Sequence, residues 1–149
     1  HLDKQSVFEE LIKAGVEPRP GCVEALQKCK DNGGKAGFVT TTTTYTIDII
    51  KKSLSTYINF EDFDIKTSSE TVSKPKPSRD IYEYVLSELK IDAAQTIAIE
   101  DTKANQNAAT NSGLKCYLYP GEYSVFNYKD TKDLNFISDG RMLPSLLSD

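Results

Sequence analysis

Apolar residues form two kinds of pattern along this chain. Spacings of three and four residues, the period of a helix buried on one face, predict helices over Asp3–Ala14, Cys22–Cys29, Thr44–Leu54, Ser78–Leu89 and Lys103–Ser112. Short apolar or β-branched runs predict strands at Ala36–Thr40, Phe63–Lys66, Thr96–Ile99, Lys115–Tyr119 and Leu134–Ile137. Strands and helices therefore alternate along most of the chain, which predicts an α/β fold with a parallel sheet. Because ligands of such sheets bind beyond the carboxyl ends of the strands, the residues after each strand are the candidates for a site.

Consecutive threonines, Thr40 to Thr44, follow the first predicted strand and open the next helix. Hydroxyls and free backbone N–H groups at the start of a helix can cradle a phosphate. A threonine-rich strand end followed by a helix cap explains the same run without a ligand. The run alone leaves both interpretations open.

Lys74 lies in the loop Ser73–Ser78, in which two prolines prevent regular structure. An ammonium held in such a loop can neutralise a phosphate and the charge that develops on it. Lys76 competes for this role two residues later. A solvated loop lysine is the alternative that needs no ligand.

Glu100 and Asp101 follow the third predicted strand and open a helix. Adjacent carboxylates suit a hard cation such as Mg²⁺, although an acidic helix cap is the competing interpretation. The hydroxyls, the lysine and the carboxylates follow consecutive strands, so a parallel sheet brings them to one edge. Hydroxyls that can bind phosphate, a cationic side chain and a pair of carboxylates that can bind a metal together indicate phosphoryl transfer.

Composition narrows the alternatives. The 149 residues are 38% hydrophobic and 27% charged, as in an ordinary soluble domain. A net charge of -4 argues against nucleic acid or an anionic membrane as a partner. His1 is the sole histidine, which excludes a Ser-His-Asp or Cys-His enzyme built from this sequence. Three cysteines without a CxxC pair favour a reducing, cytoplasmic location over a disulfide framework.

The chain resembles the haloacid dehalogenase-like superfamily, in the branch of the β-phosphoglucomutase-like and phosphoglycolate phosphatase-like enzymes. The first matching segment is PRPGCVEALQKCKDNGGKAGFVTTT, which contains a helix that follows Pro-Gly, a turn, and a strand that ends in threonine hydroxyls. The lysine loop and following helix read SKPKPSRDIYEYVLSEL, and the acidic motif and next strand read TIAIEDTKANQNAATNSGLKCYLY. The match runs in order over roughly Val16–Tyr119.

The resemblance implies a three-layer, Rossmann-like parallel sheet and Mg²⁺-dependent chemistry through an aspartyl-phosphate. The roles that it implies are phosphoryl binding by Thr40 with Thr41 and Thr42 around it, charge neutralisation by Lys74, and metal binding by Glu100 and Asp101. The implied substrate is a small phosphorylated metabolite.

One family feature has no counterpart ahead of the hydroxyl strand. In the family, a strand ending in Asp-x-Asp carries the nucleophile, and a helical cap separates it from that strand. Here only the predicted helix Asp3–Ala14 precedes it, so we interpret residues 1–15 as a cap remnant and 16–149 as the core domain. Asp62-Phe63-Asp64 matches Asp-x-Asp in letters only, because it comes after the hydroxyl strand. The resemblance thus implies an N-terminally truncated chain that is nearly inactive alone and binds Mg²⁺ weakly or not at all.

The missing strand is central in the family sheet, between Ala36–Thr40 and Thr96–Ile99. Either these strands pair directly, or another segment or chain fills the position, since open buried edges are costly. A homodimer that fills it is our expectation.

The leading functional interpretation is a Mg²⁺-dependent phosphatase. A β-phosphoglucomutase-like phosphomutase is the nearest alternative, and the cap residues would distinguish the two. A non-catalytic phosphate-binding or interaction module is an alternative of another class. A response-regulator receiver uses similar groups, but its acidic residues precede its hydroxyl and lysine, so the order here is wrong for one.

Overall fold

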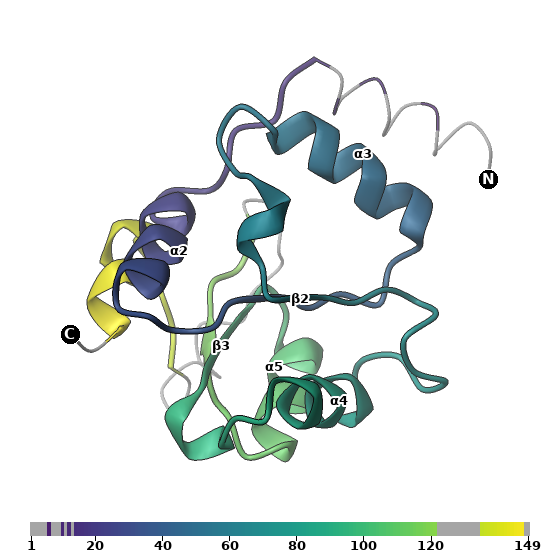
Figure 1. The fold of residues 1–149 in the computed structure, drawn as a ribbon, viewed down its shortest axis with the longest axis vertical. Helices are drawn as coiled ribbons and strands as arrows, with labels where there is room; N and C mark the ends of the chain where they lie inside the picture. The colour runs from purple at the N-terminus through teal and green to yellow at the C-terminus, as the bar shows by residue number, and fades with distance from the viewer. Residues whose placement is uncertain (1–5, 7–9, 11, 13, 122–134, 148–149) are drawn as a thin grey trace.

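A computed structural model describes residues 6, 10, 12, 14–121 and 135–147 (Figure 1). The α-helices in this part are α2 (Cys22–Asp31), α3 (Thr44–Leu54), α4 (Asp80–Leu89) and α5 (Lys103–Asn111). The strands are β1 (Gly37–Phe38), β2 (Ile65–Lys66), β3 (Ile97–Glu100) and β4 (Lys115–Leu118). Short 3-10 helices lie at Phe60–Asp62 (η1), Ala93–Gln95 (η2) and Gly140–Leu146 (η4).

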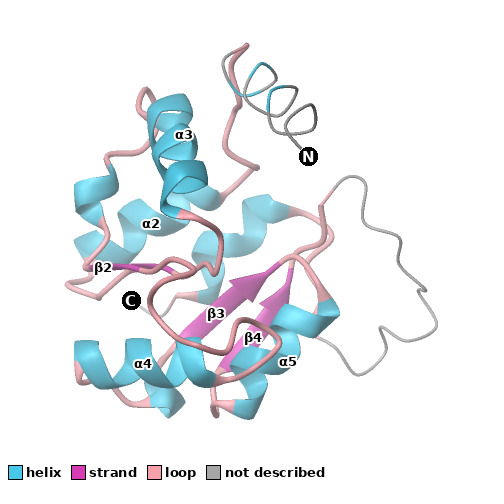
Figure 2. Ribbon diagram, turned by 90° about the vertical axis from the view of Figure 1, so that its right-hand side faces the viewer, coloured by secondary structure: helices cyan, strands magenta, loops and turns pink. Residues whose placement is uncertain are grey.

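The strands form two separate parallel pairs. β1 pairs with β2, with Phe38 opposite Lys66, and β3 pairs with β4, with Glu100 opposite Leu118. A single bridge continues the second pair from Leu118 to Phe136. In both views of the ribbon, α4 and α5 lie on one side of the strands and α2 and α3 on the other (Figures 1 and 2). The predicted α/β parallel architecture is confirmed, and among the described strands β1 and β3 do not pair with each other.

The helix predictions agree well with the structure. The bounds of α3 are those predicted, and α5 ends one residue before its predicted end, followed by Gly113 at φ +87°. One predicted start is wrong: the helix predicted from Ser78 begins at Asp80, with Arg79 as its N-cap. The Ser78 hydroxyl donates to the Asp80 carboxylate at 2.7 Å.

The strand predictions overestimate length. β1 and β2 contain two residues each, and β3 begins one residue later than predicted. The fifth predicted strand is reduced to the bridge at Phe136, and Leu134 lies outside the described residues. The predicted helix Asp3–Ala14, and with it the cap remnant at residues 1–15, falls mostly outside the described part, so this domain boundary stays a prediction.

The core lies on the β3–β4 side of the molecule. Ile81 from α4, Ala108 from α5 and Cys116 from β4 are completely buried there. A second cluster joins Tyr119, Ile137 and Leu143 beneath η4, which packs beside α2 (Figure 1). Neither α2 nor α3 buries any residue fully. The β1–β2 half of the fold is therefore the less completely packed half.

The start of α2 is fixed against the end of β4. The Arg19 guanidinium stacks on the Tyr119 ring, 3.4 Å from its centroid, and donates to the carbonyls of Tyr119 and Pro120. Gly21 has φ +82°, and a Cβ there would lie 1.7 Å from the Gly140 carbonyl oxygen. Only glycine fits this contact, which holds the helix that leads into β1.

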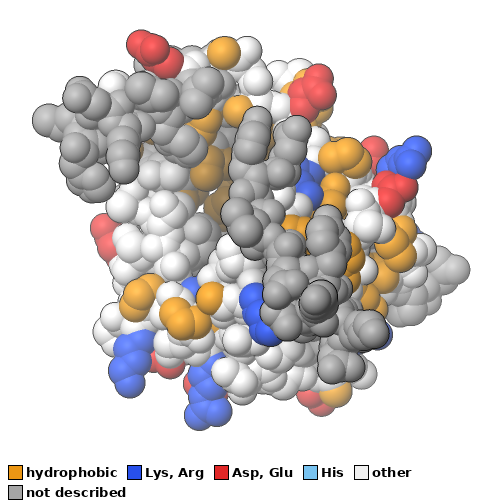
Figure 3. Space-filling view, turned by 180° about the vertical axis from the view of Figure 1, so that it is seen from behind, with side chains coloured by type: hydrophobic (Ala, Val, Ile, Leu, Met, Phe, Trp, Pro, Cys, Tyr) orange, Lys and Arg blue, Asp and Glu red, His pale blue; other side chains and the backbone are white. Residues whose placement is uncertain are grey.

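The surface agrees with the low net charge. On the face shown in Figure 3, described Lys and Arg side chains (blue) are scattered among Asp and Glu (red). On this face, the described basic side chains do not gather into one patch of the kind typical of nucleic-acid binding. Within the described residues, no helix has the length and apolar character needed to cross a bilayer.

Candidate functional site

The hydroxyl turn, which we define as Thr40–Thr42, leaves β1 beside the end of β2. The Thr40 N–H donates to Thr67 Oγ1 at 2.8 Å, and the Thr42 N–H donates to Thr40 Oγ1 at 3.1 Å. The helix cap is a different threonine, Thr43, whose hydroxyl accepts from the Thr46 N–H. The cap interpretation is therefore confirmed at Thr43, and phosphate binding by Thr40–Thr42 stays a prediction, for which capping leaves the turn available.

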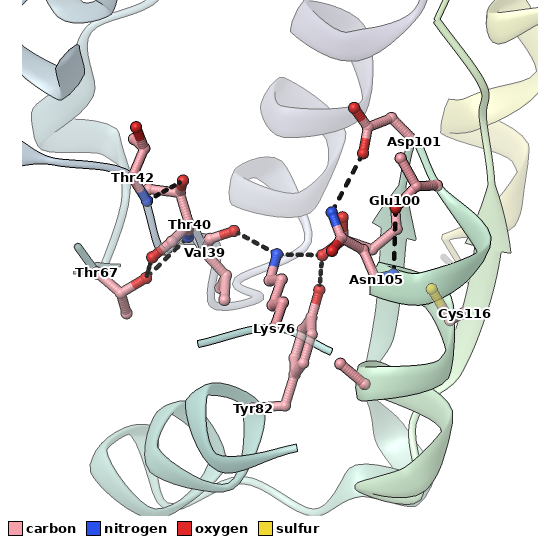
Figure 4. A network of polar contacts seen from close by, with 12 residues as sticks. Val39, Thr40, Thr42, Thr67, Lys76, Tyr82, Glu100, Asp101, Asn105 and Cys116 are labelled. Carbon is pink, nitrogen blue, oxygen red and sulfur yellow. Dashed lines mark hydrogen bonds and ion pairs between the residues drawn. The ribbon is translucent and has the colours of Figure 1, made fainter. Parts of the chain in front are cut away.

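Lys76, rather than Lys74, reaches the ends of the strands (Figure 4). Its ammonium donates to the Val39 carbonyl at 3.0 Å and forms a short ion pair with Glu100 Oε1. The Lys76 side chain is 7% exposed. Lys74 is exposed, and no hydrogen bond or ion pair connects it to a described residue. Charge neutralisation by Lys74 stays a prediction, and the lysine that lies at the ends of the strands is its competitor, Lys76.

Glu100 is buried, and one of its carboxylate oxygens accepts hydrogen bonds from two donors. Both the Lys76 ammonium and the Tyr82 hydroxyl donate to Oε1. Burial, and then the negative charge of Glu100, raise the pKa of Tyr82 well above its usual value, so the phenol keeps its proton and stays a donor. The same two causes raise the pKa of the neighbouring Cys116 thiol to about 12. The sequence analysis did not assign Tyr82 to the site, because its partner Glu100 lies on another element.

Asp101 is exposed, unlike its neighbour Glu100. The cap of α5 is Thr102, whose hydroxyl accepts from the Asn105 N–H at 3.2 Å. Asn105 Nδ2 lies 3.4 Å from Asp101 Oδ1, which steadies that carboxylate at the edge of the sheet (Figure 4). Because Thr102 caps the helix, the acidic pair is free of the capping role.

These contacts bring most of the predicted groups together, with Lys76 in place of Lys74. Lys76 connects Val39, the residue before the hydroxyl turn, to Glu100 at the end of β3. The hydroxyl turn, a buried ammonium and two carboxylates thus lie near one another at the carboxyl ends of β1 and β3, as expected for groups that follow neighbouring strands of parallel sheets.

The carboxylates suit Mg²⁺ in kind and number. Mg²⁺ is commonly held by one or two carboxylates together with waters and substrate phosphates, and Glu100 and Asp101 supply two at adjacent positions. The described residues contain no group of three or more His, Cys, Asp or Glu side chains that would form a complete cage. Residues that hold this ion would therefore be these two, with phosphate and water as the other ligands.

The Asp-x-Asp letters at residues 62–64 have other partners. Asp62 forms an ion pair with Lys30 on α2, and Asp64 Oδ2 accepts from the Ala36 N–H at 2.8 Å. These contacts connect η1 and β2 to the segment before β1. They account for both carboxylates without a catalytic role.

Comparison with known proteins gives one family. Residues 4–119 match the haloacid dehalogenase-like hydrolases. Protein CbbY of Cereibacter sphaeroides is 30% identical over 125 residues, which are 83% of this chain and 54% of that protein. A phosphorylated carbohydrates phosphatase of Thermotoga maritima is 29% identical over 77% of this chain and 50% of its own length.

The structural comparison agrees. A crystal structure of a CbbY variant from Rhodobacter sphaeroides, in complex with xylulose-(1,5)-bisphosphate, superposes with a TM-score of 0.78 at 27% identity. The superposition covers 90% of this chain and 60% of CbbY. The chain therefore spans about half the length of the two curated relatives named above. With most of its length matched in sequence and in fold, the chain belongs to the haloacid dehalogenase-like hydrolase family.

Proposed function

We propose that this chain is the core of a Mg²⁺-dependent phosphatase that acts on a small phosphorylated metabolite, with phosphorylated sugars as the favoured class. The observation that carries the proposal is the buried Lys76 between the hydroxyl turn and Glu100. The names of two relatives support the substrate class, because one is a phosphatase of phosphorylated carbohydrates and the other was crystallised with a sugar bisphosphate.

Each group has a role in phosphoryl transfer. The hydroxyl turn binds oxygens of the transferring phosphoryl group through its threonine hydroxyls. The Lys76 ammonium neutralises the negative charge of the phosphate and of the attacking carboxylate. Glu100 and Asp101 would hold Mg²⁺, which would neutralise phosphoryl oxygens and align them for in-line attack. Glu100 has one oxygen occupied by Lys76 and Tyr82, which leaves Oε2 for the ion.

The nucleophile needs a position between the two strand pairs. In a parallel ladder, alternate residues direct their N–H and C=O groups to the same side. The backbone N–H and C=O groups of Ala98 and Glu100 face β4, so those of Ile97 and Ile99 point to the opposite side. The backbone groups of Val39 likewise point away from β2, and the Val39 carbonyl accepts a hydrogen bond from Lys76. We call these unpaired sides of β1 and β3 the open edges.

The open edges suit an inserted strand. Ile99 lies on the strand next to the buried core and is still 39% exposed. A strand that paired with both edges would cover it and would place its own end beside Lys76 and Glu100. We propose that a strand of this kind carries the attacking aspartate. All four described strands are paired within their own sheet, so the strand would come from a segment outside the described residues or from another chain. The homodimer expected from the missing strand stays a prediction.

Turnover tests the proposed function. We would compare the chain with a fusion that places ahead of it the segment of CbbY that precedes the matched region, which the family resemblance implies to carry the Asp-x-Asp strand and the cap. The expected result is Mg²⁺-dependent release of phosphate from p-nitrophenyl phosphate and sugar phosphates by the fusion, and none by the chain alone, because the aspartyl-phosphate cannot form without its carboxylate.

Two outcomes would contradict this expectation. Turnover by the chain alone, abolished by Asp101→Asn, would show that the nucleophile lies within this sequence. A cooperatively folded fusion that binds phosphate and releases none from any ester would favour a non-catalytic module.

A further inference from the structure

The hydroxyl turn depends on one buried side chain from the neighbouring strand. Thr67 directly follows β2 and is only 2% exposed. Its Oγ1 accepts a hydrogen bond from the Thr40 N–H and donates one to the Thr40 carbonyl, both at 2.8 Å (Figure 4). A single hydroxyl therefore satisfies both backbone groups of the residue that begins the turn.

These two bonds interrupt the ladder between β1 and β2. The Thr67 N–H donates to the Phe38 carbonyl at 3.0 Å, as the regular register requires. The next rung would pair the Thr40 backbone with the backbone on either side of Ser68. Instead, the Thr67 hydroxyl pairs with the Thr40 N–H and C=O groups. Backbone pairing resumes where the Ser69 N–H donates to the Thr42 carbonyl at 2.7 Å.

The interruption shapes the turn. With a side chain inserted at Thr40, the backbone separates from β2 there and rejoins it at Thr42. Where the backbone has left β2, the Thr40 hydroxyl accepts a hydrogen bond from the Thr42 N–H at 3.1 Å. A valine at position 67 would keep the shape of the side chain and leave both Thr40 groups without their partner, which is unfavourable for partly buried backbone. A serine would keep the hydroxyl.

We propose that Thr67 is a positioning residue that holds the hydroxyl turn in its phosphate-binding shape. This inference rests on the proposed function for its link to phosphate, while the link between Thr67 and the turn stands on the hydrogen bonds alone. Thr67 itself acts only through Thr40, because both of its hydroxyl bonds go to that residue.

Amide hydrogen exchange on the chain itself tests the link between Thr67 and the turn. In Thr67→Val, the Thr40 amide is expected to exchange at least about tenfold faster relative to Ala98 in β3, because losing one or two hydrogen bonds shifts an equilibrium by about that factor. Thr67→Ser should restore the wild-type rate. Thr71→Val is the matched control, since it removes a threonine hydroxyl that accepts from the Ser68 N–H in the same loop.

Titration with inorganic phosphate tests the link to the ligand. Amide shifts of the hydroxyl turn should report binding that is about tenfold weaker in Thr67→Val than in the wild type, Thr67→Ser or Thr71→Val. If the wild-type turn does not respond to phosphate, the proposed function fails, and the exchange rates still decide the positioning role. An unchanged Thr40 exchange rate in Thr67→Val overturns the inference. Should that variant not fold, Thr67→Ala against Thr67→Ser gives the same comparison.

Discussion

Replacing Lys76 with methionine is expected to lower the free energy of unfolding by about 3–5 kcal/mol, the typical loss when one partner of a buried ion pair is removed. Methionine keeps most of the aliphatic volume of lysine, so the loss comes from the charge. Glu100 is 8% exposed and would keep only the Tyr82 hydroxyl as a donor. The Val39 carbonyl would also lose its partner. Urea unfolding measures the change.

Lys74→Met is the matched control. Lys74 is exposed two residues away in the same loop, so its replacement should change the free energy of unfolding by less than about 0.5 kcal/mol. The double variant Lys76→Met with Glu100→Gln should recover part of the loss, because it removes both charges of the pair. Equal effects of Lys74→Met and Lys76→Met would contradict the assignment of Lys76 to the site.

A strand inserted between the open edges is expected to slow amide exchange at Ile97 and Ile99 by about a thousandfold or more. In the isolated chain these N–H groups face away from β4 and have no described strand to pair with. Once paired in the fusion with the CbbY segment, they would exchange only through opening of the sheet, which costs several kcal/mol. Exchange followed by NMR on both proteins measures the difference.

The neighbouring amides of Ala98 and Glu100 provide the internal control. They pair with β4 in the structure and should be protected in both proteins. Protection of Ile97 and Ile99 in the isolated chain, equal to that of Ala98, would mean that the open edges are already paired and that no strand is needed.

Local patterns predicted the helices better than the strands, for a physical reason. α3 has an apolar period and a threonine cap within its own sequence, and its bounds were predicted correctly. The length of β1 depends on its neighbours: β2 pairs with it on one side, and Lys76 takes the Val39 carbonyl on the other. A strand with one short partner ends early, whatever the propensity of its residues.

The positions of some site residues follow from the order of the strands, whereas others depend on contacts between distant parts of the chain. The order of strands placed Thr40, Glu100 and Asp101 at one sheet edge, and the structure agrees. Which of two lysines turns inward depends on the path of a proline-rich loop across the fold, and local sequence does not set that path. Tyr82 and Thr67 were missed because each has its partner far away in the sequence, at Glu100 and Thr40 respectively.

If these residues serve one Mg²⁺-dependent phosphoryl transfer, phosphate release by the fusion protein depends on Asp101. The measurement is the rate of release when Asp101 is replaced by asparagine, with Asp62→Asn as the control carboxylate. We predict a loss of roughly a hundredfold or more for Asp101→Asn, since a bound metal contributes several kcal/mol of charge stabilisation, and no loss of rate for Asp62→Asn, whose partner is Lys30. A rate that survives Asp101→Asn, or that falls with Asp62→Asn instead, would contradict the account.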